Sequence, residues 1–377
     1  MITITKDFPR ENLYPIESAT KGLAPVLFDI ETTGLSAKNA TIYLIGAILI
    51  KRDRVNFVQW FAEGPSEERS VLDSFLSWLP DKSCLITFNG RGFDIPFLCK
   101  KCKGFDIPCY LPQMPDIDLY RALGPLKNYF DMPGRRLVAY EQLIGLNRED
   151  TFNGGELVDV YREYVGKNKF DKETAEELKA MLLLHNEEDI RDMLPVMSLL
   201  TYIDLFGGNY KSCEVSASSG AAASAEADQA GNAENSFVEL TITMHSDFVA
   251  DSRHTLATLP GIPAIETIAS GNTARIRIPI VNGTFKHYFP DYKNYYYLPG
   301  EDTAIHKSIA SAVESGHRLQ ATKTTAFTKA SGLFVPQPRE VINPSFKKDA
   351  TDKISFAPLS RFASDSADLK SYVKSLF

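Results

Sequence analysis

The chain has 377 residues, of which 44% are hydrophobic and 24% charged, and its formal net charge at pH 7 is −7. Its length and apolar content allow two domains with sizeable cores. The longest apolar stretch, 42–50, is too short to span a bilayer, and no positively charged start precedes an apolar run. Five cysteines, an odd number, argue against a disulfide framework. We therefore expect a cytoplasmic enzyme without a membrane partner.

The first informative segment is 26–34, a short apolar run that carries Asp29 and Glu31 and ends in a polar turn with a glycine. Alternate residues of a strand share one face, so the two carboxylates project together. Adjacent carboxylates repel each other and raise each other's pKa unless a cation neutralises them. A hard cation such as Mg²⁺ or Mn²⁺ prefers oxygen ligands. The alternative is a pair of solvated acids at a strand end.

The next segments predict a compact α/β start. Residues 43–51 and 55–62 read as the two strands of a hairpin around a charged turn. Residues 67–79 have the apolar periodicity of an amphipathic helix. Together with the first strand, they predict a three-stranded antiparallel unit with a helical crossover.

A second acidic segment follows a predicted strand at 85–88. Asn89 opens a glycine-containing turn that ends at Phe93 and Asp94. Asp94, two residues before Pro96, has the spacing of an N-cap and first turn of a helix. This helix carries Cys99 and Cys102, with Cys109 beyond it. A zinc site needs four ligands and no fourth is near, so we expect reduced, partly buried thiols.

The third segment lies in a helix that follows another predicted helix near 137–146. Residues 175–184 are helical in pattern and lead into His185 and Asp189, which are four apart and share a face. Asp192, one turn further, is a reserve carboxylate ligand. The alternative reading of His185 is a structural histidine.

In this order and context, the three segments resemble the DEDD superfamily of 3′–5′ exonucleases, in particular the bacterial YprB-type exonuclease-like domain. The resemblance covers about residues 20–205. It implies a ribonuclease H-like mixed sheet flanked by helices. One departure is the spacing of the histidine: members with His place it five residues before the Asp, whereas His185 has the four-residue offset of the Tyr-containing members.

The resemblance also implies a two-metal hydrolysis of phosphodiester bonds at the 3′ end of single-stranded DNA or RNA. Two divalent cations, Mg²⁺ or Mn²⁺, would be held by Asp29, Glu31, Asp94 and Asp189, and His185 would accept a proton from water. The expected contacts to the terminal nucleotide are Thr32, Thr33, Gly34, Asn89 and Phe93. Ordinary core packing is the alternative for Phe93.

The segment 213–236, rich in Ser, Ala and Gly, cannot bury enough surface to fold and is interpreted as a flexible linker. It separates the exonuclease domain, 1–212, from a smaller α+β accessory domain, 237–377. In the second domain we expect strands at 237–244, 273–280 and 332–336. A helix is expected at 302–313.

Charge is divided unevenly along the chain. Residues 237–377 carry 16 Lys and Arg against 13 Asp and Glu, a net charge of +3, and the remainder has a net charge of −10. The basic balance and the tyrosines near 288–297 suggest that the second domain helps to hold nucleic acid. Two alternatives to an exonuclease stay open: a ribonuclease H-like endonuclease, and a nucleic-acid-binding or scaffold protein without turnover. Protein partners are not indicated.

Overall fold

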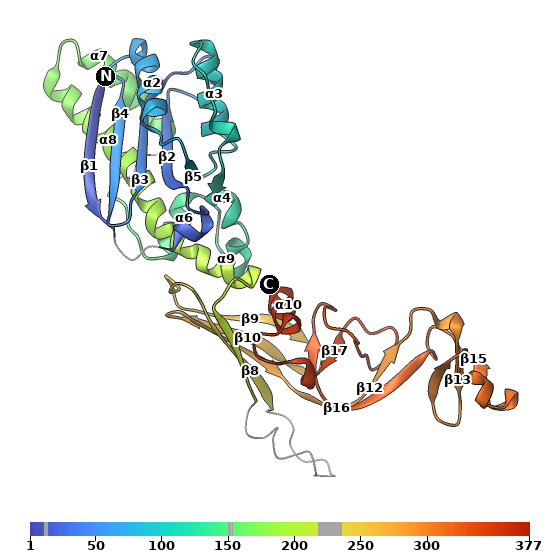
Figure 1. The fold of residues 1–377 in the computed structure, drawn as a ribbon. Helices are drawn as coiled ribbons and strands as arrows, with labels where there is room; N and C mark the ends of the chain where they lie inside the picture. Colours follow the sequence, from blue (N-terminus) through green and yellow to red (C-terminus); the bar gives the residue numbers. More distant parts are fainter. Residues whose placement is uncertain (11–13, 150–151, 153, 218–235) are drawn as a thin grey trace. The chain divides into compact units, whose positions relative to one another are not determined.

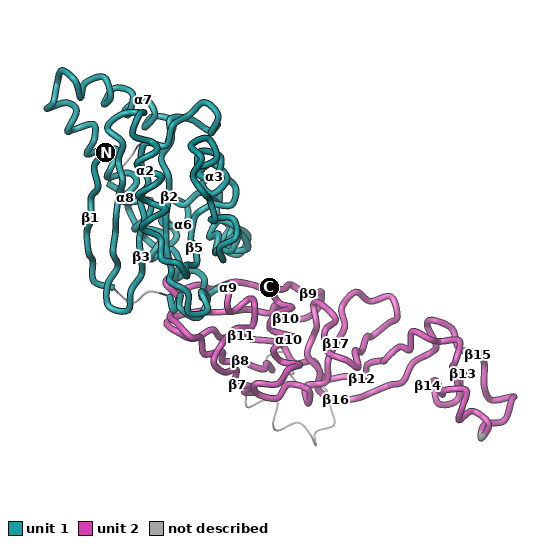
Figure 2. The backbone as a smooth tube through the Cα atoms, turned by 45° about the horizontal axis from the view of Figure 1, so that its top comes forward, with its two compact units in different colours: residues 1–203 teal, residues 204–377 magenta. Residues whose placement is uncertain are grey.

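The computed structural model describes residues 1–10, 14–149, 152, 154–217 and 236–377. These residues divide into two compact units, Met1–Ile203 and Asp204–Phe377, coloured separately in Figure 2. The boundary precedes the one predicted at 212/213. Most of the predicted linker, 218–235, lies outside the described residues.

A six-stranded mixed sheet forms the centre of the first unit, with the order β1-β4-β3-β2-β5-β6. Figure 1 labels its strands from β1 to β5. Neighbours from β1 to β2 are antiparallel, and β5 and β6 continue the sheet in parallel with β2. The strands are β1 (Ile2–Pro9), β2 (Ala24–Thr32), β3 (Ile42–Ile50), β4 (Arg54–Phe61), β5 (Ser83–Thr87) and β6 (Asp116–Asp118). The mixed sheet flanked by helices is confirmed, and β1 is an edge strand beyond the predicted elements.

Helices lie between and after the strands of the first unit. Those of the first unit are α1 (Ile16–Ala19), α2 (Glu68–Trp78), α3 (Asp94–Gly104), α4 (Leu119–Ala122), α5 (Leu126–Tyr129), α6 (Leu137–Leu143), α7 (Gly154–Lys167) and α8 (Lys172–Val196); α9 (Leu200–Gly207) crosses the unit boundary. Asp171 caps α8 by accepting a hydrogen bond from the backbone N–H of Thr174. Among the described residues, no helix combines the length and the hydropathy that a membrane crossing requires.

Alternation along the strands places α2 and α8 on opposite faces of the sheet. Phe28 of β2 packs against Phe75 of α2, with ring centroids 5.2 Å apart. On β4, Gln59 faces the other way and donates hydrogen bonds to the Leu183 carbonyl and to Asn186 Oδ1 of α8. Because Asp29 follows Phe28, its side chain lies on the α8 face. Both faces of the central strands are therefore covered, which explains why β3 is apolar along nearly its whole length.

Close approach of α8 to the sheet depends on a glycine. Gly46 of β3 pairs with Asp29, and a Cβ built there would lie 2.1 Å from Asn186 Oδ1 and 2.2 Å from Ile190 Cδ1. We expect Gly46→Ala to lower the free energy of unfolding by about 1–3 kcal/mol, because it overpacks this contact. Urea unfolding measures this change. The matched control is Gly64→Ala, where a Cβ meets no atom within 4 Å; equal losses in both variants would contradict the explanation.

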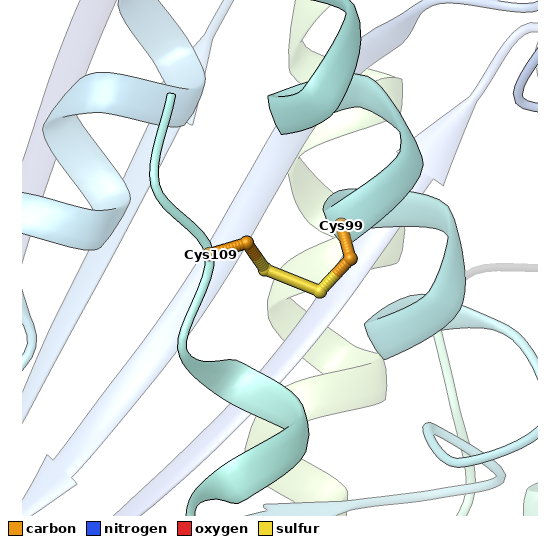
Figure 3. The surroundings of a disulfide bond; sticks show 2 residues. All are labelled: Cys99 and Cys109. Atoms are coloured by element: carbon orange, nitrogen blue, oxygen red, sulfur yellow. A yellow bond between two sulfur atoms is a disulfide. The ribbon is translucent and has the colours of Figure 1, made fainter. Parts of the chain in front are cut away.

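The cysteines differ from expectation. Cys99 of α3 and Cys109 of the following segment form a disulfide, with their Cα atoms 5.6 Å apart (Figure 3). The prediction of reduced thiols was therefore wrong for this pair. An odd number of cysteines excludes complete pairing but permits one local bridge. In the described part of the chain, Cys84, Cys102 and Cys213 are free and buried. Because Cys99 is in the disulfide, it has no thiolate to offer to zinc.

The second unit consists mainly of antiparallel sheets, with helix α10 (Ala367–Leu376) near the end of the chain. A five-stranded sheet has the order β7-β8-β11-β10-β9, and two three-stranded sheets have the orders β12-β16-β17 and β14-β13-β15. The strands are β7 (Ser212–Ala217), β8 (Phe237–Thr243), β9 (Ser252–Leu259), β10 (Ile262–Ser270), β11 (Thr273–Pro279), β12 (Val281–Tyr288), β13 (Tyr295–Leu298), β14 (Thr303–His306), β15 (Leu319–Gln320), β16 (Phe327–Gln337) and β17 (Ser355–Pro358).

Two expectations for this unit are corrected. The predicted helix 302–313 is instead strand β14 followed by a short 3-10 turn, Ala310–Ala312. The turn Leu298-Pro299-Gly300 closes a hairpin between β13 and β14, and Asp302 has a positive φ of 47°, which a helix start does not accept. Residues 213–217 of the predicted linker belong to β7, because their backbone pairs with β8.

Candidate metal centre and active site

Three side chains from β2 and α8 converge on one point of the first unit. His185 Nε2 lies 3.6 Å from Glu31 Oε1 and 3.4 Å from Asp189 Oδ2. One ligand atom from each of Glu31, His185 and Asp189 fits within a group no wider than 4.8 Å. Glu31 and His185 are only 8% and 7% exposed. The four-residue offset of His185 therefore brings its ring to the same corner as Asp189.

Asp29 and Asp94 lie in the same electrostatic neighbourhood but outside this compact group of ligand atoms. Burial raises the pKa of Asp29 well above its ordinary value, and the charges of Asp94, Glu31 and Asp189 raise it further. Burial is also the main reason that the pKa of Asp94 rises to about 7. These carboxylates therefore repel one another when they are ionised and no cation is present.

The side chain of Asp94 makes a hydrogen bond to the backbone of β2, and this contact differs from the predicted N-cap role. It is the first residue of α3, whose N-cap is Phe93, and its Oδ1 accepts a hydrogen bond from the backbone N–H of Ile30 at 3.2 Å. Asp94 therefore ties α3 to β2 and does not serve as the N-cap of its own helix. On Asp29, Oδ2 accepts a hydrogen bond from Asn186 Nδ2 at 3.5 Å.

The turn before Asp94 is fixed by a buried carboxylate that the sequence reasoning missed. Asp118, 6% exposed, accepts hydrogen bonds from the backbone N–H groups of Asn89 and Arg91 at 3.0 and 3.3 Å. Asn89 has a φ of 67°, a left-handed conformation that asparagine tolerates better than most residues. A Cβ at Gly90 would lie 2.3 Å from Thr87 Oγ1, so only glycine fits there. The signal in the sequence was Asp118 itself, at the end of a short strand.

Arg148 is a second residue that the sequence reasoning missed. Its Nε and Nη2 donate to the carboxylate of Glu141 at 2.6 and 2.5 Å, and its Nη1 lies 2.5 Å from Asp189 Oδ1. Glu141 is fully buried. Burial opposes the charge of Arg148, but its pairing with Glu141 and Asp189 outweighs this effect and raises the pKa. The positively charged guanidinium of Arg148 thus contacts Asp189 of the cluster. The hint in the sequence was an acid, Glu141, inside a mostly apolar helical pattern.

The polar turn after β2 is closed by its own hydroxyl groups. Thr32 Oγ1 donates to the Gly34 carbonyl at 2.9 Å, and Thr33 Oγ1 accepts from the backbone N–H of Thr41 at 2.8 Å. Both predicted substrate contacts therefore also hold the turn in place. The next residue, Leu35, is 89% exposed, so an apolar side chain stands in solvent beside the acidic motif.

Two further predicted residues are not members of the compact group. Phe93 packs its ring against Phe97, with centroids 5.4 Å apart, at the edge of the hydrophobic core. Asp192 lines a pocket with Phe8 and Pro195, and burial raises its pKa to about 6. Asp192 is thus not part of the Glu31–His185–Asp189 group.

The donor set suits a divalent cation. Two carboxylates and one imidazole converge, and two more carboxylates with raised pKa values lie beside them. Carboxylate-rich sites of this kind favour Mg²⁺ or Mn²⁺. Repulsion among these carboxylates disfavours the ionised state of the metal-free site. A bound cation would relieve that repulsion.

Part of the chain is similar to known proteins. Residues 26–201 match the model of the RNase_H superfamily. A 172-residue stretch is 30% identical to the YprB protein of Bacillus subtilis (strain 168), covering 44% of this chain and 39% of that protein. A 134-residue stretch is 28% identical to the PolC-type DNA polymerase III of Mycoplasma pneumoniae, covering 29% of this chain and 9% of that protein. This chain therefore spans well under two thirds of the length of either relative.

Among solved structures, the family B DNA polymerase of Pyrobaculum calidifontis aligns with a TM-score of 0.38 and 18% sequence identity. The alignment covers 48% of this chain and 25% of the polymerase. The matches to the superfamily model and to YprB confirm the resemblance from which the ribonuclease H-like fold was expected.

Proposed function

We propose that the protein is a metal-dependent 3′–5′ exonuclease of the DEDD type, on the basis of the match of residues 26–201 to the RNase_H superfamily model. Its substrate would be the 3′ end of single-stranded DNA or RNA. The observation that carries the proposal is the convergence of Glu31, His185 and Asp189 beside two further carboxylates, half-buried Asp29 and buried Asp94. Strand β2 and helix α8, far apart in the sequence, supply the three converging groups.

Different residues of the site would bind the cations and transfer the proton. Asp29, Glu31, Asp94 and Asp189 would hold two cations. When bound there, the cations would supply Lewis-acid chemistry: a lowered pKa for a bound water molecule and stabilisation of the negative charge on the leaving 3′ oxygen. His185, buried between Glu31 and Asp189, would hold or accept the proton of that water.

The turn after β2 and the turn before α3 would receive the terminal nucleotide. Thr32 and Thr33 would line the first turn, where the Thr33 N–H already donates to the Thr41 carbonyl at 2.9 Å. Gly34 is expected to approach the nucleotide with its backbone N–H. Exposed Leu35 offers an apolar surface for the base. Asn89, whose backbone is fixed by Asp118, would contact the sugar or base from the opposite turn. Phe93 would act mainly by fixing that turn, because its ring packs on Phe97.

The direct test is a time course with a 5′-labelled single-stranded oligonucleotide, in DNA and RNA versions, with Mn²⁺ or with EDTA. We expect a ladder that shortens from the 3′ end in Mn²⁺ and is absent in EDTA. A second substrate with a blocked 3′ end separates exonuclease from endonuclease action: cleavage of the blocked strand would contradict the proposal and favour an endonuclease. No cleavage of any strand, beside an active control nuclease, would favour a binding protein without turnover.

A further inference from the structure

A small sheet in the second unit closes around four phenylalanines. Strand β16 pairs with β12 along one stretch and with β17 along another. The segment 346–347 bridges β17 and β12, since Phe346 pairs with Phe356 and Lys347 with Lys286. The buried cluster inside consists of Phe285, Phe334, Phe346 and Phe356. Each of these strands therefore has one face directed to a shared core.

Three lysines form a row on the outer face of this sheet. Lys286 pairs directly with Lys329 of β16 on one side and with Lys347 on the other. Directly opposed residues of antiparallel strands point to the same face. Lys286 and Lys347 each follow an inward phenylalanine, Phe285 and Phe346, so their side chains point outward. With strands about 4.8 Å apart, the row spans about 10 Å.

This row, which we call the lysine row (Lys286, Lys329, Lys347), places like charges side by side, an arrangement that destabilises a sheet. Carboxylates compensate at its ends: Asp302 pairs with Lys329, and Glu340 lies 4.0 Å from Lys347. Within the described residues, no carboxylate lies within ion-pair distance of the central Lys286, whose ammonium lies over the Phe327 ring, 4.7 Å from its centroid. The three lysines thus share two ion-paired carboxylates, and the charge of Asp302 also acts on Lys286.

We propose that the lysine row is a binding site for the phosphate backbone of single-stranded nucleic acid. A row of ammonium groups across two strands and the bridging segment 346–347 matches a chain of phosphates, and Lys binds phosphate as a point charge. The surplus positive charge agrees with the net charge of +3 of residues 237–377, against −10 for the remainder. The choice of nucleic acid among polyanions rests on the function proposed for the first unit.

The test measures binding in EDTA, which removes the divalent cations that cleavage would require. The full chain is titrated against a 5′-labelled oligothymidylate by fluorescence anisotropy at several salt concentrations. For Lys286→Gln we expect weaker binding and a slope of log K against log salt that is shallower by about 0.7, the value for one phosphate contact on a single strand. The triple Gln variant of the lysine row should reduce the slope by about 2.

The matched control is Lys370→Gln, which removes one exposed charge of the same unit from α10. Unchanged salt slopes in Lys286→Gln and the triple variant would overturn the proposal, and so would an absence of binding by the native chain. Anionic vesicles that bind through the lysine row while the oligonucleotide does not would overturn it in favour of a membrane surface. Because cleavage plays no part, this result is independent of the nuclease assay: failure of that assay alone overturns the proposed function and leaves the lysine row standing.

Discussion

Asp29→Asn is expected to lower the rate of hydrolysis by at least about 10²-fold, the scale on which removal of one charge-stabilising group slows an enzyme. The reason is the loss of a cation ligand at the centre of the carboxylate cluster, where Asp94, Glu31 and Asp189 all act on Asp29. The fold should persist, because the amide oxygen of Asn can still accept the hydrogen bond from Asn186. The measurement is the initial rate on the labelled oligonucleotide in Mn²⁺.

Two further measurements on Asp29→Asn, of Mn²⁺ binding and of thermal stability, accompany this rate. Calorimetric titration with Mn²⁺ should show weaker uptake by Asp29→Asn than by the native chain. Thermal unfolding in EDTA should show that the variant is at least as stable, because one repelling charge is gone. The control is Asp159→Asn on α7, whose carboxylate side chain is 81% exposed. A variant at Asp29 with native activity would contradict the site assignment.

Metal-free protein is expected to lose stability as the pH rises from about 4 to about 7. Asp94 has an ordinary pKa of 3.8 and a folded-state pKa of about 7, raised mainly by burial. A raised folded-state pKa means that the folded chain holds the proton more tightly than the unfolded chain. The resulting stabilisation is complete below pH 3.8 and is lost as the pH passes 7. At about 1.4 kcal/mol for each pKa unit, the loss is at most about 4 kcal/mol.

Asp94→Asn isolates this contribution, because asparagine does not titrate and its oxygen can still accept from the Ile30 N–H. Urea unfolding in EDTA at pH 4, 6 and 8 measures the difference between variant and native chain. We expect this difference to shift in favour of the variant by a few kcal/mol as the pH rises. Saturating Mn²⁺ should abolish the trend in the native chain. A difference that stays constant with pH would contradict the buried, protonated state of Asp94.

The sequence alone determined the elements that carry the chemistry. Asp29 and Glu31 share a face because strand geometry has a period of two, and His185 and Asp189 share a face because helix geometry has a period near four. Apolar runs predicted β2 to β5, and glycines predicted the turn before Asp94. These are local properties, so a single chain reveals them. The positions of Phe28 in the core and Asp29 on the opposite face followed from the same rule.

Only the tertiary structure decided which distant groups meet. Arg148 reaches Asp189 and the buried Glu141 because the loop after α6 packs beside α8, and no periodicity encodes that contact. Strand β14 replaced a predicted helix because β13 offered it hydrogen-bonding partners. The disulfide of Cys99 and the pairing of Lys286 with two lysines depend on the spatial approach of separate segments. Local patterns fix faces and turns, whereas burial, pKa values and non-local pairs arise only when the chain has folded.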